Sequence, residues 1–161
     1  MTWAENKTTS ARSVTVRATC KEDTSKYKDI TISQSAGYYT YGNITINSFA
    51  YGAISAVGGN VSPSITYSQP YGWNGATSGA GTINGNGDDD YTTYAETTTH
   101  SALTVNTTTG VVTWTKNNAT AGSVDVARSG VITATVTRNG KTATKTATTT
   151  QNAEVISSYS D

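Results

Sequence analysis

Leu, Met and Phe are almost absent from this sequence of 161 residues: Leu103, Met1 and Phe49 are the only ones. The chain holds 33 Thr, 15 Gly and 10 Tyr instead. Leu and Met favour helices, whereas Thr, Val, Ile and Tyr suit a pleated, half-buried surface. The composition therefore predicts an all-β fold. The length allows one sizeable domain, or one domain and part of another.

The sequence has no excess charge of either sign and no long apolar run. Eleven basic and eleven acidic side chains cancel, and none of them forms a long run of one sign, so we expect neither nucleic acid nor an anionic membrane as a partner. No segment approaches the ~20 apolar residues of a membrane span, so we expect no membrane insertion. The opening "MTWAENKTTS" lacks the charged start and apolar centre of a secretory signal.

Cysteine is represented once, by Cys20. A single cysteine excludes an intrachain disulfide and argues against a Cys-based metal site. Segment 13–20 alternates, with Val14, Val16, Ala18 and Cys20 on one side, and this period of two predicts a strand with one dry face. Cys20 is therefore expected to be a buried strand thiol.

Further strands follow from the same pattern. Ile30 and Ile32 alternate after a polar turn and complete a hairpin with segment 13–20. Extended pieces are expected around 44–46 and 61–67, and "ALTVNTTTGVVTWT" predicts a second hairpin. Residues 70–90 are rich in glycine and predict either a long loop or two short strands with wide turns. Near the end, Asn139-Gly140 predicts a two-residue type I′ turn between two strands.

One phrase occurs twice. "RSVTVRAT" at 12–19 is repeated as "RSGVITAT" at 128–135, and after a one-residue difference in the turn Lys28, Thr31, Gln34 and Ala36 align with Lys145, Thr148, Gln151 and Ala153. Both phrases are read as the last hairpin of the same kind of module. This divides the chain into the tail of one module at 1–37, a complete module at 38–152, and a linker toward a following module at 153–161.

The segments "VNTTTGVVTWT" and "GVITATVTRNGKTATKTATTTQ" resemble bacterial immunoglobulin-like repeats of the Big-2 type, as in surface and phage virion proteins of gut Bacteroidetes. The resemblance covers about 40–152 and the half copy at 10–37. It implies an immunoglobulin-like β-sandwich, here with an additional N-terminal β-hairpin from a partial repeat. It also implies a non-enzymatic structural or assembly module in a virion or at a cell surface. The glycine-rich region 70–95 departs from the family pattern.

The half copy raises the question of what covers its apolar face, because an isolated two-stranded hairpin is marginal in water. The candidate assembly residues are Val14, Val16, Ala18, Ile30 and Ile32. Three options stay open: the hairpin packs on the complete domain of its own chain, another chain supplies the missing strands, or the chain is a fragment with an unfinished module. The second option makes self or a neighbouring immunoglobulin-like module the partner.

An alternative function is adhesion through the loops of 70–95. Tyr71, Trp73, Tyr91 and Tyr94 are candidate ligand-binding residues, since aromatic rings on loops suit surface carbohydrate or protein. The competing interpretation is that some of them, Trp73 especially, plug the end of the sandwich.

Little in the sequence indicates chemistry. Asp88, Asp89 and Asp90 offer oxygen ligands to calcium, but they lack EF-hand spacing and are read as a polar turn. His100 would be the residue of a hydrolase, and nothing marks a partner for it, so it is read as a surface histidine. No catalytic residue and no cofactor is expected.

Overall fold

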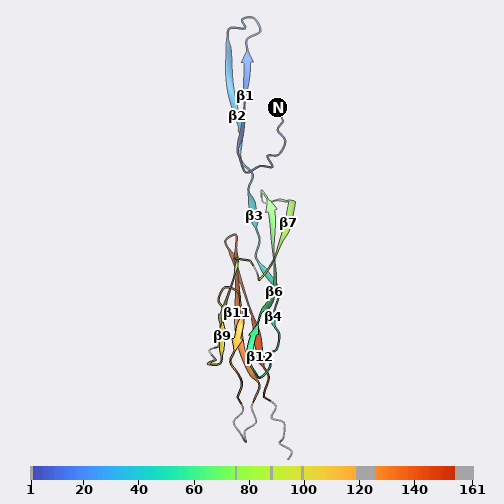
Figure 1. Ribbon diagram of the computed structural model, residues 1–161. Helices are drawn as coiled ribbons and strands as arrows, with labels where there is room; N and C mark the ends of the chain where they lie inside the picture. Colours follow the sequence, from blue (N-terminus) through green and yellow to red (C-terminus); the bar gives the residue numbers. More distant parts are fainter. Residues whose placement is uncertain (1, 75, 88, 99, 119–125, 155–161) are drawn as a thin grey trace, which may run out of the picture. The chain divides into compact units, whose positions relative to one another are not determined.

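The computed structural model describes residues 2–74, 76–87, 89–98, 100–118 and 126–154 (Figure 1). Within these ranges the secondary structure is all β, without a helix. The strands are β1 (Arg12–Thr19), β2 (Tyr27–Gln34), β3 (Tyr39–Tyr41), β4 (Thr45–Tyr51), β5 (Gly59–Val61), β6 (Pro63–Trp73), β7 (Ala76–Asn86), β8 (Thr92–Glu96), β9 (Leu103–Val105), β10 (Val112–Trp114), β11 (Arg128–Arg138) and β12 (Lys141–Gln151).

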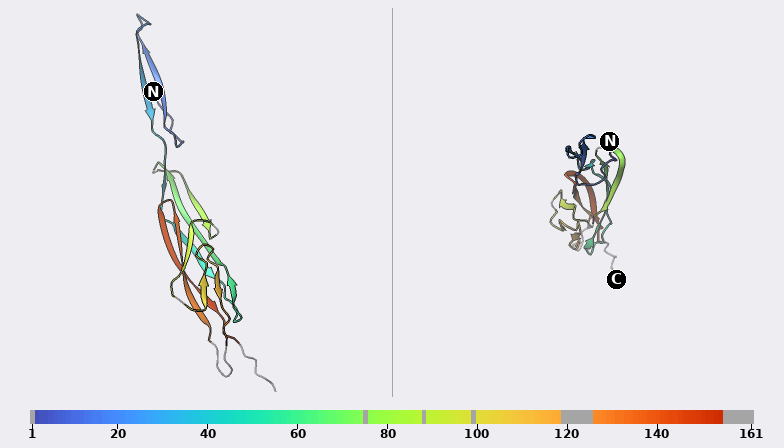
Figure 2. Two further views of the ribbon diagram at one scale, coloured as in Figure 1. Left: turned by 60° about the vertical axis from the view of Figure 1, so that its left-hand side comes forward. Right: turned by 90° about the horizontal axis from the view of Figure 1, so that it is seen from above.

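The strands form several sheets in two compact units. The first unit spans Met1–Thr40 and Tyr71–Gly81, and the second spans Tyr41–Pro70 and Thr82–Asp161. The hairpin β1–β2 belongs to the first unit. The sheet orders are β1-β2, β5-β10-β9, β12-β11-β8 and β3-β6-β4, with β7 paired to β6. The long hairpin β11–β12 can be followed in Figure 2 by its orange and red strands.

The second unit is a β-sandwich with one apolar core. Strands of three sheets contribute to it, because alternate residues of each strand point inward. The core includes Ile46 and Phe49 of β4, Ile65 and Tyr67 of β6, Tyr94 of β8, Leu103 of β9, Val112 and Trp114 of β10, and Ile132, Ala134 and Val136 of β11. Trp114 lies deepest among the aromatic residues of this core together with Tyr67, since only 1 % of each is exposed.

Two polar side chains of this core, Trp114 and Gln151, donate hydrogen bonds. The indole Nε1 of Trp114 donates to Thr149 Oγ1 at 3.1 Å. The side-chain amide of Gln151 donates to three backbone carbonyls, those of Ser55, Ala56 and Thr115. Because a buried amide without partners would cost free energy, Gln151 ties the end of β12 to two neighbouring segments.

The predicted hairpins are confirmed. β9 and β10 pair antiparallel, and so do β11 and β12. Asn139 and Gly140 both have positive φ, 50° and 70°, as a type I′ turn requires. β1 and β2 form the expected N-terminal hairpin.

The prediction for residues 70–90 is wrong in part, because this region holds two long strands rather than a loop or two short ones. β6 and β7 pair with each other, and Gly81 and Gly85 of β7 lie where tyrosine rings of β6 need room. A Cβ on Gly85 would stand 2.2 Å from the Tyr67 ring, and one on Gly81 would stand 2.5 Å from the Tyr71 hydroxyl. Glycine here makes space for a neighbouring side chain and does not mark a turn.

The repeated phrase forms the same structure twice. In β1–β2, Arg12 pairs with Gln34 and Ala18 pairs with Lys28. In β11–β12, the aligned residues pair in the same way, Arg128 with Gln151 and Ala134 with Lys145. A one-residue slip would turn every side chain to the other face, so the shared register shows that both hairpins present equivalent faces.

The contact between Gly85 and Tyr67 makes a stability prediction. Replacing Gly85 with Ala forces its Cβ against the buried ring, and we expect a loss of about 1–3 kcal/mol in the free energy of unfolding. The matched control is Gly52→Ala, whose Cβ would lie 3.7 Å from Val61 Cγ2, an ordinary contact. Urea denaturation of both variants measures the difference, and equal stabilities would contradict the account.

Candidate functional site

The hairpin β1–β2 has one apolar face and one polar face. The cross-strand pairs Val14–Ile32 and Val16–Ile30 place these four side chains on the same face as Ala18. This face is open to solvent: the exposed fraction is 37 % for Val14, 52 % for Ile30 and 38 % for Ile32. The expectation of a dry face is therefore wrong for the chain by itself, and the candidate assembly residues form one uncovered surface.

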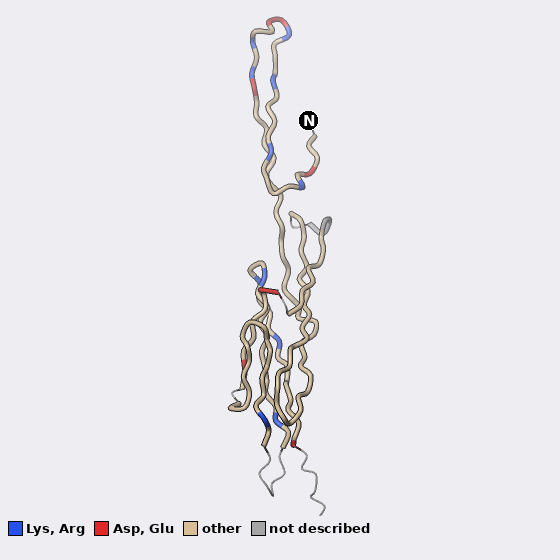
Figure 3. The backbone as a smooth tube through the Cα atoms, viewed as in Figure 1, with Lys and Arg blue, Asp and Glu red and all other residues tan. Residues whose placement is uncertain are grey.

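The opposite face of the hairpin carries polar and charged side chains. Arg17 and Asp29 form a two-pronged ion pair, with both N–O distances at 2.7 Å. The Arg17 guanidinium also lies over the Tyr27 ring, 3.8 Å from its centre. Arg17 holds the pKa of the Asp29 carboxyl below its usual range by this hydrogen bonding. Charged residues of both signs are spread along the hairpin and gather at its turn (Figure 3).

Cys20 corrects a second expectation. It lies just beyond the end of β1 and is exposed, because the face to which it belongs is uncovered. Hydrogen bonds with the backbone of Glu22 and Asp23 lower the pKa of its thiol. Its counterpart in the sandwich, Val136, is fully buried.

The half copy is longer than the repeated phrase indicated. Asn6 Nδ2 donates to the carbonyls of Ser10 and Ser35, at 2.8 and 2.9 Å. Asn117 Nδ2 donates to the carbonyls of Val126 and Asn152, at 3.0 and 3.2 Å. The acceptor residues are the aligned positions of the two copies, so Asn6 and Asn117 perform the same task.

A second bond repeats in the same manner. Gln34 Nε2 donates to the Ala4 carbonyl at 3.2 Å, as Gln151 Nε2 donates to the Thr115 carbonyl at 2.9 Å. Thr2-Trp3-Ala4-Glu5-Asn6 therefore corresponds to Thr113-Trp114-Thr115-Lys116-Asn117. The shared T-W-x-x-N motif was the available signal in the sequence, and the repeat identified at 12–19 and 128–135 did not include it. Residues 2–34 match 113–151.

The two copies differ in what surrounds them. In the sandwich, β8 pairs with the outer edge of β11. On the other side, the backbone of Ile54 forms hydrogen bonds with Thr150 of β12 and with Asn152 just after it. Among the described residues, no strand pairs with β1 or β2 except each other. Trp3, the counterpart of the core residue Trp114, is only half-buried, and the Arg12 guanidinium lies 5.5 Å from its ring centre. The half copy therefore has the structure of the last hairpin of a sandwich, but no described strand pairs with its edges.

The four aromatic candidates do not form one surface. Trp73 is 8 % exposed and packs against Tyr39, with ring centres 4.7 Å apart, in the first unit. Tyr71 packs edge-on against the same ring at 5.8 Å. Tyr94 is buried in the core of the second unit beside Phe49. Of the four, Tyr91 is the exposed one, with 42 % of its surface accessible.

Tyr91 borders an open cleft of about 540 Å³ in the second unit, lined by Asn84, Gly85, Asn86, Asp89, Tyr91 and Arg138. The Arg138 guanidinium lies 4.4 Å from the centre of the Tyr91 ring, and its Nη1 donates to the Tyr67 hydroxyl at 3.3 Å. That hydroxyl donates in turn to Asp89. Burial, aided by the Asp89 carboxylate, raises the pKa of Tyr67. Arg138 thus contacts both the Tyr91 ring and the Tyr67 hydroxyl, and that hydroxyl in turn holds the Asp89 carboxylate.

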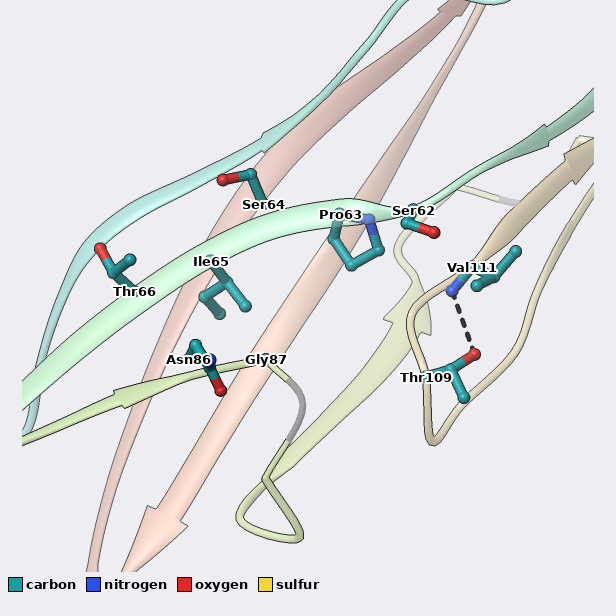
Figure 4. Close-up of a pocket in the computed structure, with 9 residues that line it drawn as sticks. All are labelled: Ser62, Pro63, Ser64, Ile65, Thr66, Asn86, Gly87, Thr109 and Val111. Atoms are coloured by element: carbon teal, nitrogen blue, oxygen red, sulfur yellow. Dashed lines mark hydrogen bonds between the residues drawn. The ribbon is translucent and has the colours of Figure 1, made fainter.

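A second hollow of about 410 Å³ adjoins this cleft, since Asn86 lines both. Pro63 and Ile65 project from β6 on the side of Asn86 and Gly87, whereas Ser64 and Thr66 project from the other side of the strand (Figure 4). The Val111 amide donates to Thr109 Oγ1 at 3.4 Å across the turn that closes the hollow. The hollow contributes hydroxyl and amide groups but no charged side chain.

The remaining sequence candidates have structural contacts. Asp89 accepts hydrogen bonds from Tyr67, from Thr92 and from the Tyr91 amide, which fixes the turn. Asp90 is exposed, and Asp88 lies outside the described residues. His100 Nδ1 accepts from the Ala102 amide at 3.1 Å, and its ring packs on Trp114. Over the described ranges, no group of three His, Cys, Asp or Glu is placed to hold a metal ion.

Comparison with known proteins adds no identification. No family model, no curated protein and no solved structure matches this sequence. The part of the chain that the structure describes contains no helix long and apolar enough to cross a membrane.

Proposed function

We propose that this chain is a non-enzymatic structural module of a phage virion or bacterial cell-surface protein, and that it assembles by donating residues 2–34 to another immunoglobulin-like sandwich. The observation that carries the proposal is the shared bonding of the two copies. Asn6 makes both hydrogen bonds of Asn117, and Gln34 makes one of the three of Gln151, in a hairpin of the same register.

The amphipathic character of the hairpin supports donation. Val16 and Ile30 lie on one face, and the Arg17–Asp29 pair lies on the other. An exposed apolar patch rimmed by polar groups is typical of an interaction surface. Burying it contributes on the order of 1 kcal/mol or more for each large side chain. Strand addition also satisfies the backbone groups at the open edge of β1.

The setting in a virion or at a cell surface rests on the resemblance of "GVITATVTRNGKTATKTATTTQ" to Big-2 repeats. A Thr-rich exterior with balanced charge suits a spacer or decoration in such an array. Fold alone does not determine function, so the setting is a proposal drawn from those motifs.

The apolar face predicts self-association when no acceptor is present. Two uncovered faces can cover each other, so light scattering of the full chain should give a molar mass that rises with concentration. Ile30→Asp should abolish the rise, because it places a charge on that face. Thr31→Asp is the matched control, since Thr31 pairs with Thr15 on the polar face of the same strands. A chain that stays monomeric, or equal effects of both substitutions, would argue against an assembly surface.

A second candidate function, adhesion to surface carbohydrate, is favoured by the cleft beside Tyr91. An exposed ring can pack on the apolar face of a sugar, while amide, carboxylate and guanidinium groups bond its hydroxyls. The cleft supplies these groups from Asn84, Asp89 and Arg138. Trp73 takes no part in this version, because it is buried in the first unit.

The adhesion proposal predicts that Tyr91→Ala abolishes binding to mucin-type glycans on an array without lowering the free energy of unfolding by more than ~0.5 kcal/mol. Tyr38→Ala is the control, since Tyr38 is also an exposed tyrosine and does not line the cleft. If the parent chain binds no glycan, or if both variants bind as the parent does, the adhesion proposal fails.

A further inference from the structure

At three neighbouring positions, the inner face of the half copy carries a larger side chain than its counterpart in the sandwich. Val14 stands where Gly130 stands, Ile32 where Thr149 stands, and Ile30 where Ala147 stands. The two tails share a register, but the half copy is larger at these three positions and smaller at Val16 and Cys20, which stand where Ile132 and Val136 stand. The difference determines which core each tail can complete, because sandwich interiors are close-packed.

We propose that residues 2–34 bind a partner sandwich module that lacks its own counterpart of residues 113–151 and that has a side chain smaller than leucine where this chain has Leu103. The inference rests on the proposed donation and specifies its partner.

Leu103 is the residue that decides the fit. A Cβ on Gly130 would stand 2.4 Å from Leu103 Cδ2, and valine adds two methyl groups beyond that Cβ. Leu103 is buried in the core, so its side chain has to shift before any Cβ can stand at this position. A sandwich with leucine at this position therefore rejects Val14, and one with alanine or glycine accepts it.

The exchange of Thr149 for Ile32 also implies that the partner has to supply a hydrogen-bond acceptor. In the sandwich, Trp114 Nε1 donates to Thr149 Oγ1. Ile32 replaces this threonine in the half copy and has no acceptor, so the partner has to offer an acceptor for the indole N–H of Trp3. Trp3 would then be the central anchor of the interface, as Trp114 is of the core.

A second copy of this chain does not meet these requirements. A second copy has Leu103 at the position that Val14 would meet, so its core would exclude Val14. The partner is therefore a module of the same architecture with a different core.

The contacts of β11 and β12 in the sandwich indicate which other groups the partner has to supply to β1 and β2. β11 receives β8 as an antiparallel neighbour, so the partner contributes a strand along the outer edge of β1. Lys145 Nζ donates to the carbonyls of Ile46 and Asn47, at 3.3 and 3.2 Å. Lys28 is its counterpart, and it reaches two backbone carbonyls of the partner in the same way.

Transplantation tests the inference in the full chain. Residues 113–151 are replaced by the sequence of residues 2–34, and the original Cys20 is changed to Ser, so the transplanted cysteine is the single thiol and takes the place of buried Val136. One form keeps Leu103 and the other carries Leu103→Ala. In the alanine form we expect iodoacetamide to label this thiol at least about a hundredfold more slowly than it labels Cys20 of the parent, because core positions open only by global unfolding. In the leucine form we expect labelling at least about tenfold faster than in the alanine form, because valine overpacks against leucine.

The parent chain provides the control. In the parent chain, Leu103→Ala removes a buried side chain and should lower the urea midpoint of unfolding. In the transplanted chain the same substitution makes room for valine and should raise the midpoint. Equal protection of the two transplanted forms would overturn the size requirement and leave donation standing. An unprotected thiol in both forms would show that residues 2–34 cannot complete a sandwich, which would overturn the proposed function as well.

Discussion

The structure depends on one constraint: the inner face of a tail hairpin is apolar and has to be covered by other strands. Residues 113–151 meet it within the second unit, where Ile132, Ala134 and Val136 are fully buried. Residues 2–34 fold into the same hairpin with the same bonds from Asn6 and Gln34, yet their apolar face stays open. Local hydrogen bonding is thus enough to define the shape of the tail, and covering strands are needed to bury it.

The second unit meets the constraint with aliphatic and aromatic side chains packed together. Trp114, Tyr67 and Tyr94 fill much of the core volume, and glycines in β7 accommodate the rings that project from β6. Tyrosine at such positions also brings a hydroxyl that needs a partner. The Tyr67 hydroxyl finds Asp89 and Arg138, and this contact orients the side chains around Tyr91.

Much of this fold could be predicted from the sequence, because period-two alternation and turn residues are local signals. The type I′ turn at Asn139-Gly140 and the hairpin register of the repeated phrase are examples. The strands of 70–86 could not be predicted, since glycine in a strand reports a neighbouring side chain that the local sequence does not name. For the same reason, Cys20 was predicted to be buried and is exposed, whereas Tyr94 was predicted to lie on a binding loop and is buried. Whether an alternating face is buried depends on which other strands lie against it, and this is not a local property.

The central claim is that the half copy is a sandwich tail without its covering strands, and amide hydrogen exchange of the full chain tests it most directly. The amides of Val16 and Ala18 would be compared with those of their counterparts Ile132 and Ala134. The account predicts that exchange in β1 is faster by several orders of magnitude, because one edge of β1 is open and its inner face is wet. Equal protection at the paired positions would contradict the account, since it would mean that the hairpin is already covered.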